Sequence, residues 1–349
     1  MQTKITRRVF TSRMIRSYFF SSLLFLSGSV LSYPKTFQVY DKYQNMFRHN
    51  GRPLFIVIRG NDLVELMTKG LSRLLKSSNI APKKDKVFIQ PNANSNEPYP
   101  VATDVQFLNA STNFLKDIGN NGILVGDNPF YKETYIIKDQ EHSNLKRENI
   151  NVFTDDPGIG YSYCTVYNKD WLSNTAILVN KEMINADLVI NMAITKHHPE
   201  ADFAYVLIDN FGSASNKVRA QTHLRTETNN KNGPTFFDRI IVEIADAFRP
   251  QITIVDVRSI LTKSGPSFHS ENVVHNDGKK IIISGNMSVI GAYCSKLLEN
   301  HDPTFRIEKI VNYQINYAER IGLGVADLLQ VELIEYNPLN PTIYNNMRT

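Results

Sequence analysis

Short apolar runs alternate with amphipathic segments along most of the chain. The apolar runs occupy residues 54–58, 86–90, 122–126, 187–192, 251–256 and 280–284. Segments with apolar positions three and four residues apart, the spacing of one helix face, occupy residues 63–75, 105–118, 236–248, 288–298 and 308–320. Apolar strands separated by helices are typical of a parallel sheet covered on both faces. The pattern therefore predicts an α/β fold with a mostly parallel, doubly wound sheet in three layers.

Two polar segments interrupt this alternation. Residues 128–180 are rich in Tyr, Asn, Lys and Asp and have no clean period, which predicts an irregular insertion. Residues 213–234 are also polar, and we expect a mobile loop or lid there. We therefore expect a single α/β domain over residues 54–335. A linker over residues 33–53 precedes it, and a C-terminal tail over residues 336–349 follows it.

The first 32 residues differ in charge from the rest. They contain no acidic residue and five basic residues, which are Lys4, Arg7, Arg8, Arg13 and Arg16. The whole chain has a formal net charge of +5, so the remainder is neutral. Nucleic-acid-binding domains carry a basic patch or stripe. We therefore expect no nucleic-acid partner.

The same 32 residues have the order of an export signal over residues 1–32. An apolar stretch, residues 18–31, follows the basic region and is shorter than the ~20 residues that a membrane-spanning helix needs. Residues 6–10, Thr-Arg-Arg-Val-Phe, resemble the twin-arginine pattern; a Sec-type signal or an uncleaved anchor is the alternative. We expect an exported protein, periplasmic or envelope-associated, that uses the twin-arginine export machinery. It would contact the membrane only through an uncleaved signal.

Cysteine content limits the cofactors. The chain has two cysteines, Cys164 and Cys294, which are too few for an iron–sulfur cluster or a four-cysteine zinc site. We expect two isolated, buried thiols. The cofactor is otherwise unknown from the sequence, and a divalent metal is a candidate.

Polar residues follow the predicted strands. In an open α/β sheet, ligands bind at the carboxyl ends of the strands. Asn92 and Asn94 follow the second strand and Asp127 the third. Lys196, His197 and His198 follow the fourth, and Asp256 and Gly265 follow the fifth. We therefore expect these side chains to bind a small molecule at one edge of the sheet.

Different residue types suggest different roles at this edge. His198 or His197 is the candidate general base, with Lys196 beside it and His223 closing over it from the polar loop. Asp127 and Asp256, together with His198, are the candidate metal ligands. Asn92, Asn94, Asn210 and Gly265 are candidate substrate-binding residues. The structural alternatives are capped turns for the carboxylates and surface positions for the histidines.

Several motifs, in order, resemble the bacterial and archaeal family called domain of unknown function 362. They are Gln90–Asn92, Pro100–Asp104, Gly126–Pro129, Ala186–His198, Asp209–Gly212, His223, Ile254–Asp256, Gly265–Pro266 and Gly322–Gly324. The resemblance covers roughly residues 54–330. It implies an α/β scaffold and metal-assisted or redox chemistry on a small molecule.

The chain departs from the family pattern in places. It lacks the ferredoxin-type cysteine cluster, has Asn286 and Gly291 where the family has carboxylates, and has Asp209 in place of a lysine. Two hypotheses follow. The first is an exported enzyme with a histidine-centred site. The second is a non-catalytic envelope binding module on the same scaffold. A water-excluding site with perturbed ionisable groups would favour the enzyme.

Overall fold

The computed structural model describes residues 36–38, 46–78, 86–93, 97–128, 163–225, 234–263, 265–276, 279–305 and 307–337. The expected export signal, Asn94 and residues 129–162 of the expected insertion lie outside these ranges. No helix among the described residues is long and apolar enough to span a membrane. The two cysteines are buried and are not bonded to each other.

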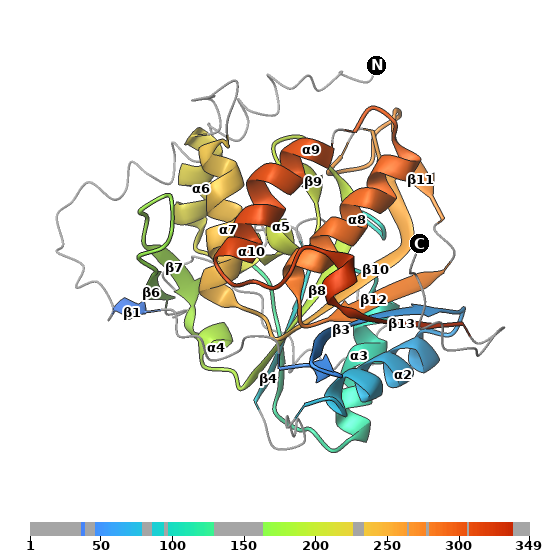
Figure 1. Ribbon diagram of the computed structural model, residues 1–349. Helices are drawn as coiled ribbons and strands as arrows, with labels where there is room; N and C mark the ends of the chain where they lie inside the picture. Colours follow the sequence, from blue (N-terminus) through green and yellow to red (C-terminus); the bar gives the residue numbers. More distant parts are fainter. Residues whose placement is uncertain are drawn as a thin grey trace. The chain divides into compact units, whose positions relative to one another are not determined.

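A mixed, mostly parallel sheet forms the centre of the domain (Figure 1). Its strands lie in the order β13 (Glu332–Tyr336), β3 (Arg52–Arg59), β12 (Lys280–Ser284), β10 (Ile252–Thr262), β8 (Leu188–His198), β4 (Val87–Pro91) and β5 (Ile123–Val125). Strand β12 runs antiparallel to both of its neighbours, and the other pairs along this path are parallel. The predicted α/β class is confirmed.

Shorter strands extend this framework. The sheet is extended by β2 (Arg48–His49) on β3, β9 (Asp202–Ala204) on β8 and β11 (Val273–His275) on β10. A second, three-stranded sheet contains β1 (Thr36–Gln38), β6 (Tyr163–Tyr167) and β7 (Ile177–Asn180). We expected an irregular insertion over residues 128–180, but residues 163–167 and 177–180 of it form paired antiparallel strands.

Two helices cover one face of the sheet, below it in Figure 1. They are α2 (Leu63–Leu75) and α3 (Val105–Asp117), and their N-termini are capped by the side chains of Asp62 and Asp104. Alternate residues of β3, namely Leu54, Ile56 and Ile58, pack against them. Burial of this apolar stripe stabilises both helices, because short helices gain most of their stability from packing.

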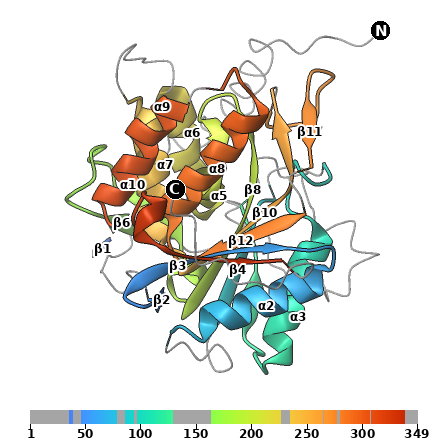
Figure 2. The ribbon, with the colours of Figure 1, turned by 45° about the vertical axis from the view of Figure 1, so that its right-hand side comes forward.

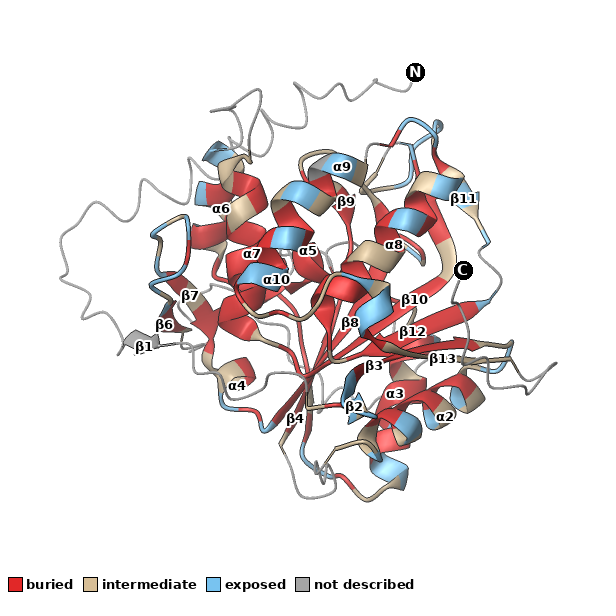
Figure 3. Ribbon diagram, in the orientation of Figure 1, coloured by how far each residue is buried: buried red, intermediate tan, exposed pale blue. Residues whose placement is uncertain are grey.

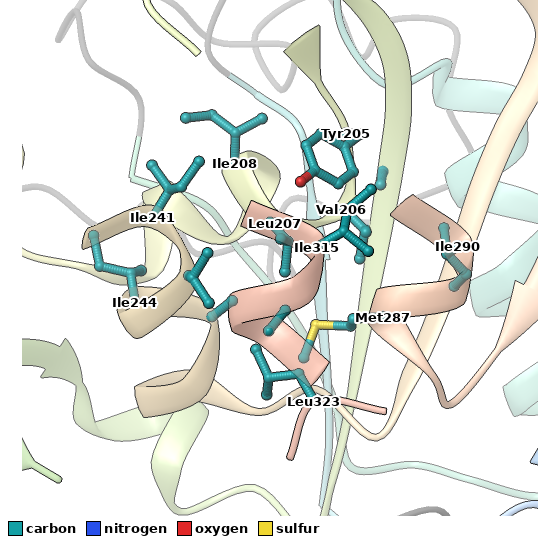
Figure 4. Packing of buried hydrophobic residues seen from close by; sticks show 14 of the residues in the cluster. Tyr205, Val206, Leu207, Ile208, Ile241, Ile244, Met287, Ile290, Ile315 and Leu323 are labelled. Carbon is teal, nitrogen blue, oxygen red and sulfur yellow. The ribbon is translucent and has the colours of Figure 1, made fainter. Parts of the chain in front are cut away.

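The other face carries most of the remaining helices (Figures 1 and 2). They are α5 (Val206–Asp209), η4 (Asn210–Ser213), α6 (Asn216–Arg225), α7 (Phe236–Phe248), α8 (Met287–His301), α9 (Ile307–Ile310), η5 (Val311–Ile315) and α10 (Asn316–Arg320). Two further short elements are α4 (Lys181–Ile184) and η6 (Leu328–Gln330). Figure 4 shows the core of this layer, where α5 is enclosed by side chains of α7 and α8.

Buried residues run along the central strands and along the inner sides of the helices (Figure 3). The predicted helices at 63–75 and 236–248 have the expected bounds. The prediction of a mobile loop was wrong for residues 216–225, which form α6. Strands β8 and β10 are longer than predicted, so Lys196, His197, His198 and Asp256 lie within strands rather than after them.

Candidate functional site

A chain of buried amides lies between the sheet and α5. It consists of Gln90 on β4, Asn191 on β8 and Asn210 at the end of α5, each with an exposed fraction of at most 1%. Asn191 Nδ2 donates to Gln90 Oε1 at 3.3 Å and to Asn210 Oδ1 at 3.2 Å. Buried polar groups are costly unless they are hydrogen-bonded. These bonds therefore fix the carboxyl end of β4 against η4.

Two carboxyl groups lie beside these amides. Asp127 accepts hydrogen bonds from Gln90 Nε2 at 3.2 Å and from the backbone N–H of Ala93 at 2.9 Å. Asp209 accepts from Asn92 Nδ2 at 2.7 Å on one oxygen and from the backbone N–H of Ile194 at 2.8 Å on the other. Burial raises the pKa of both carboxyl groups, and the charge of Asp127 raises the pKa of Asp209 further.

Gly212 has a steric role at Asp127. A Cβ at residue 212 would lie 1.7 Å from Asp127 Oδ1. The turn after Asn210 can therefore approach the carboxylate only because residue 212 has no side chain. Gly265 makes a similar approach, since its Cβ would lie 1.8 Å from the backbone oxygen of His197.

Lys196 is a buried lysine of the site, with an exposed fraction of 3%. Its Nζ donates to the backbone carbonyl of Val101 at 2.5 Å. Desolvation lowers the pKa of Lys196, and the charges of Asp209 and Glu97 oppose this effect. Burial thus lowers the pKa of Lys196 and raises the pKa of Asp209. The charge of each residue favours the charged form of the other.

The adjacent histidines have defined tautomers. The backbone N–H of Gly265 donates to His197 Nδ1 at 3.0 Å, and the backbone N–H groups of Glu200 and Ala201 donate to His198 Nδ1 at 3.2 and 3.1 Å. Each neutral ring therefore carries its proton on Nε2. Loss of solvation lowers the pKa of His197, and it lowers the pKa of His198 to about 3.

Helix α6 brings His223 to His198. His223 Nδ1 lies 2.5 Å from Glu200 Oε2, and the ring contacts Phe237, on which His198 also stacks. The charge of His223 lowers the pKa of His198, so the two rings belong to one cluster. The predicted approach of His223 to His198 is present, but on a helix rather than on a loop.

Arg219 lies one helical turn before His223 on α6. It is buried, donates to the backbone carbonyl of Asn128, and its charge lowers the pKa of Asp127. Positions i and i+4 share one helix face. Helix α6 therefore presents one basic and one imidazole side chain to the two ends of the site.

Asp256 lies apart from this cluster. It is held by Arg258, with Nη2 to Oδ2 at 2.6 Å, and by the hydroxyl of Tyr99 at 2.9 Å. Arg258 also pairs with Asp104 at the start of α3, on the other face of the sheet. No three His, Cys, Asp or Glu side chains converge in a metal-binding geometry within the described part of the chain. The predicted set of Asp127, Asp256 and His198 is therefore not assembled there.

Two amide acceptors in the site are unused by the described residues, Asn191 Oδ1 and Asn92 Oδ1. Asn92 is 2% exposed and binds Asp209 through Nδ2, but its Oδ1 has no hydrogen-bond partner among the described residues. Asn94, its predicted neighbour in the site, lies outside those residues. An unpaired buried acceptor costs free energy. Asn92 Oδ1 is thus an open position for a donor on a ligand.

Sequence reasoning missed four contributors: Gln90, Asn191, Glu200 and Arg219. Gln90 and Asn191 each interrupt an apolar strand, and a polar residue at a buried strand position is the signal that indicates them. Asp209 was noted only as a departure from the family lysine. Asp209 directly follows the apolar run 206–208, and a polar residue at the end of a buried apolar run is the signal that could have indicated it.

Comparisons with known proteins give a family and two distant structures. The family model described as "Domain of unknown function (DUF362)" matches residues 87–296. No curated protein matches the chain. The chain is similar to the lactate racemase apoprotein from Thermoanaerobacterium thermosaccharolyticum, with 13% identity and a TM-score of 0.40 over 64% of this chain and 54% of that one.

A protein from Thermotoga maritima is similar to the same extent. Its identity to this chain is 13% and its TM-score is 0.39, over 60% of this chain and 53% of that one. The chain therefore spans about half the length of each of these two structures.

Proposed function

The chain belongs to the family of the domain of unknown function 362, and from this premise we propose that it is an acid–base enzyme that acts on a small polar molecule. The site is the cluster at β4, β8 and α5, which contains Asp127, Asp209, Lys196 and Asn92, with His198 and His223 beside it. Its reaction is a proton transfer to or from the bound molecule.

One observation carries the proposal. Asp209 and Lys196 are both nearly fully buried, and burial displaces their pKa values toward each other. Groups whose environments bring their pKa values near neutrality are suited to general acid–base catalysis. Such clusters are characteristic of functional sites.

The residues have separate tasks in this proposal. Asp209 holds a proton that it can donate or regain, and Lys196 supplies the second proton position. Asn92 Oδ1 orients the ligand by accepting a hydrogen bond. His198 is neutral because loss of solvation holds its pKa near 3, so its Nε2–H is a donor rather than a cation.

The family resemblance also led us to expect a metal-assisted reaction. The described residues fit a metal poorly, because Asp256 is held by Arg258 and Tyr99 away from His198. We therefore assign no step to a metal. The acid–base steps use only groups that the cluster contains.

The test is proton exchange in heavy water. The purified chain is incubated in D₂O with pyruvate, glyceraldehyde and lactate, and loss of C–H signals is followed by proton NMR. We expect exchange with at least one compound and loss of that exchange in Asp209→Asn. Lys280→Arg is the control, because Lys280 is a buried lysine on β12 outside the cluster.

A binding module is the second candidate, and one observation favours it. Both oxygens of Asp127 and both of Asp209 already accept hydrogen bonds from the protein, as expected of a rigid recognition site. In that case one of the three compounds raises the melting temperature without C–H exchange. That result would replace the enzyme proposal.

We also propose that residues 1–32 export the protein. The basic residues and the Thr-Arg-Arg-Val-Phe sequence at 6–10 support this. Replacement of Arg7 and Arg8 by lysine keeps the charge but removes the pair. We expect the variant to accumulate in the cytoplasm, measured by cell fractionation. Unchanged export would contradict a twin-arginine route.

A further inference from the structure

The position of Lys196 favours a covalent role. We propose that the Lys196 amine forms a Schiff base with a small aldehyde or ketone and that Asp209 carries the protons of that reaction. This inference rests on the proposed function and names its substrate class. Trapping of the imine separates failure of the covalent step from failure of the acid–base proposal.

The hydrogen bonding of the Lys196 amine favours its neutral form. An ammonium group has three N–H donors. Among the described residues, Lys196 Nζ has one acceptor, the carbonyl of Val101. A neutral amine needs fewer acceptors and has a lone pair for attack on a carbonyl carbon. The buried surroundings of Lys196, with one acceptor for its Nζ, therefore favour the neutral amine, which is the form that can attack a carbonyl carbon.

The neighbouring carboxyl group of Asp209 is held in a fixed position. Both oxygens of Asp209 are occupied, one by Asn92 Nδ2 at 2.7 Å and one by the backbone N–H of Ile194 at 2.8 Å. Asp209 therefore acts on Lys196 through its charge while its own position is fixed. A fixed carboxyl group that interacts with the amine can carry the protons of imine formation and so accelerate it.

Asn92 offers an unused hydrogen-bond acceptor to a substrate. Asn92 Oδ1 lies on the amide that holds Asp209, is buried and has no partner among the described side chains and backbone groups. Addition of an amine to a carbonyl produces a hydroxyl group. Asn92 Oδ1 can accept the hydrogen bond of that hydroxyl or of a hydroxyl already on the substrate.

The reaction balances without an oxidant or reductant. The Lys196 nitrogen lone pair forms the C–N bond, the carbonyl π electrons move to oxygen, and a proton passes from nitrogen to that oxygen. Asp209 then donates a proton to the hydroxyl, which leaves as water. The nitrogen lone pair forms the C=N bond, and the proton lost from nitrogen returns to Asp209. The products are one imine and one water.

The experiment traps the imine in the full chain. Protein is incubated with glyceraldehyde, pyruvate or acetone in the presence of sodium cyanoborohydride, which reduces the imine to a stable secondary amine. Peptide mass spectrometry then locates the adduct. We expect at least one compound to modify Lys196 preferentially. We also expect Asp209→Asn to slow this modification by about 100-fold, the usual scale of a lost general acid.

Two variants make the result decisive. Lys196→Arg removes the adduct, whereas Lys280→Arg, at another buried lysine, retains it. The peptide map of the unaltered chain gives the same answer if Lys196→Arg does not fold. Modification spread evenly over surface lysines, or absent from Lys196 with all three compounds, overturns the inference. If C–H exchange still depends on Asp209 in that case, the acid–base proposal stands. If it does not, both fail.

Discussion

The protein contains two groups of buried acidic residues, which differ in whether the polar side chains beside them leave hydrogen-bonding positions unused. Helix α7 carries Asp238, Glu243 and Asp246, each fully buried. Asp246 accepts from Trp171 Nε1 at 2.6 Å and pairs with Arg249, while Glu243 accepts from Tyr317 and from the backbone of Ser173. These carboxylates attach the 168–173 segment and α10 to the core.

The second group is the site. Asp127 and Asp209 are as well bonded as the acids of α7, but Asn92 Oδ1 beside them has no partner and Lys196 has one acceptor among the described residues. Burial of a charge is therefore common to structural and chemical clusters. The site is distinguished by an unused acceptor and a lysine with one acceptor that both lie beside Asp209, because a ligand can occupy these positions.

The strongest test of this contrast is Asp209→Asn. The substitution keeps the size of the side chain and removes the proton that the site transfers. We expect the rate of C–H exchange to fall by about 10²–10⁴-fold, with the fold retained. Exchange is measured by NMR, and folding by circular dichroism. A variant that exchanges at the original rate would show that Asp209 belongs with the structural acids of α7.

The matching change in the other group is Tyr317→Phe. It removes the hydroxyl that donates to Glu243 at 2.6 Å and accepts from the backbone N–H of Leu172 at 2.9 Å. We expect the free energy of unfolding to fall by about 2–3 kcal/mol, because a buried carboxylate and an N–H lose a partner. Urea unfolding followed by Trp171 fluorescence measures this. Exchange at the site should not change.

The third test is the dependence of stability on pH. In the folded protein, loss of solvation lowers the pKa of His198 from its ordinary value of 6.5 to about 3. Between these values the unfolded chain binds more protons at His198 than the folded chain does, so the contribution of His198 to stability falls as the pH falls below about 6.5. We expect His198→Gln to remove up to about 2 kcal/mol of this loss at pH 5. His269→Gln, at an exposed histidine, is the control and is measured over the same pH range.

The smallest effect is expected at Gly212. In Gly212→Ala the new methyl group would displace Asp127 Oδ1 and the turn of η4. We expect a loss of about 1–2 kcal/mol in the free energy of unfolding, together with slower exchange. Thermal unfolding and the NMR assay measure the two effects. An unchanged variant would mean that Asp127 is not held rigidly against η4.

Hydrophobic periodicity predicted the sheet and most of its helices. The helix at 63–75 and the one at 236–248 have apolar faces that the spacing of residues shows directly. Helix α6 was missed because two of its three buried residues, Arg219 and Thr222, are polar. The direction of β12 was also not predictable, since an apolar strand has the same pattern in both orientations.

The candidate site was predicted in part. Asn92, Asp127, Asn210 and Lys196 follow or end apolar runs, and the structure brings them together. Asp256 also ends an apolar run, but its side chain pairs with Arg258 on the other face of the sheet. The contacts of Gln90 with Asp209 and of Asn92 with Asp209 join residues more than 100 positions apart, which no local pattern indicates.

The two carboxyl groups of the site each hold a different backbone amide. The N–H of Ala93 bonds to Asp127 at 2.9 Å, and the N–H of Ile194 bonds to Asp209 at 2.8 Å. An amide proton that bonds to a carboxylate shifts its resonance when the carboxylate gains a proton. Isotope-labelled protein therefore contains two separate indicators, and the Ala93 and Ile194 signals would report the ionisation of each acid in one titration.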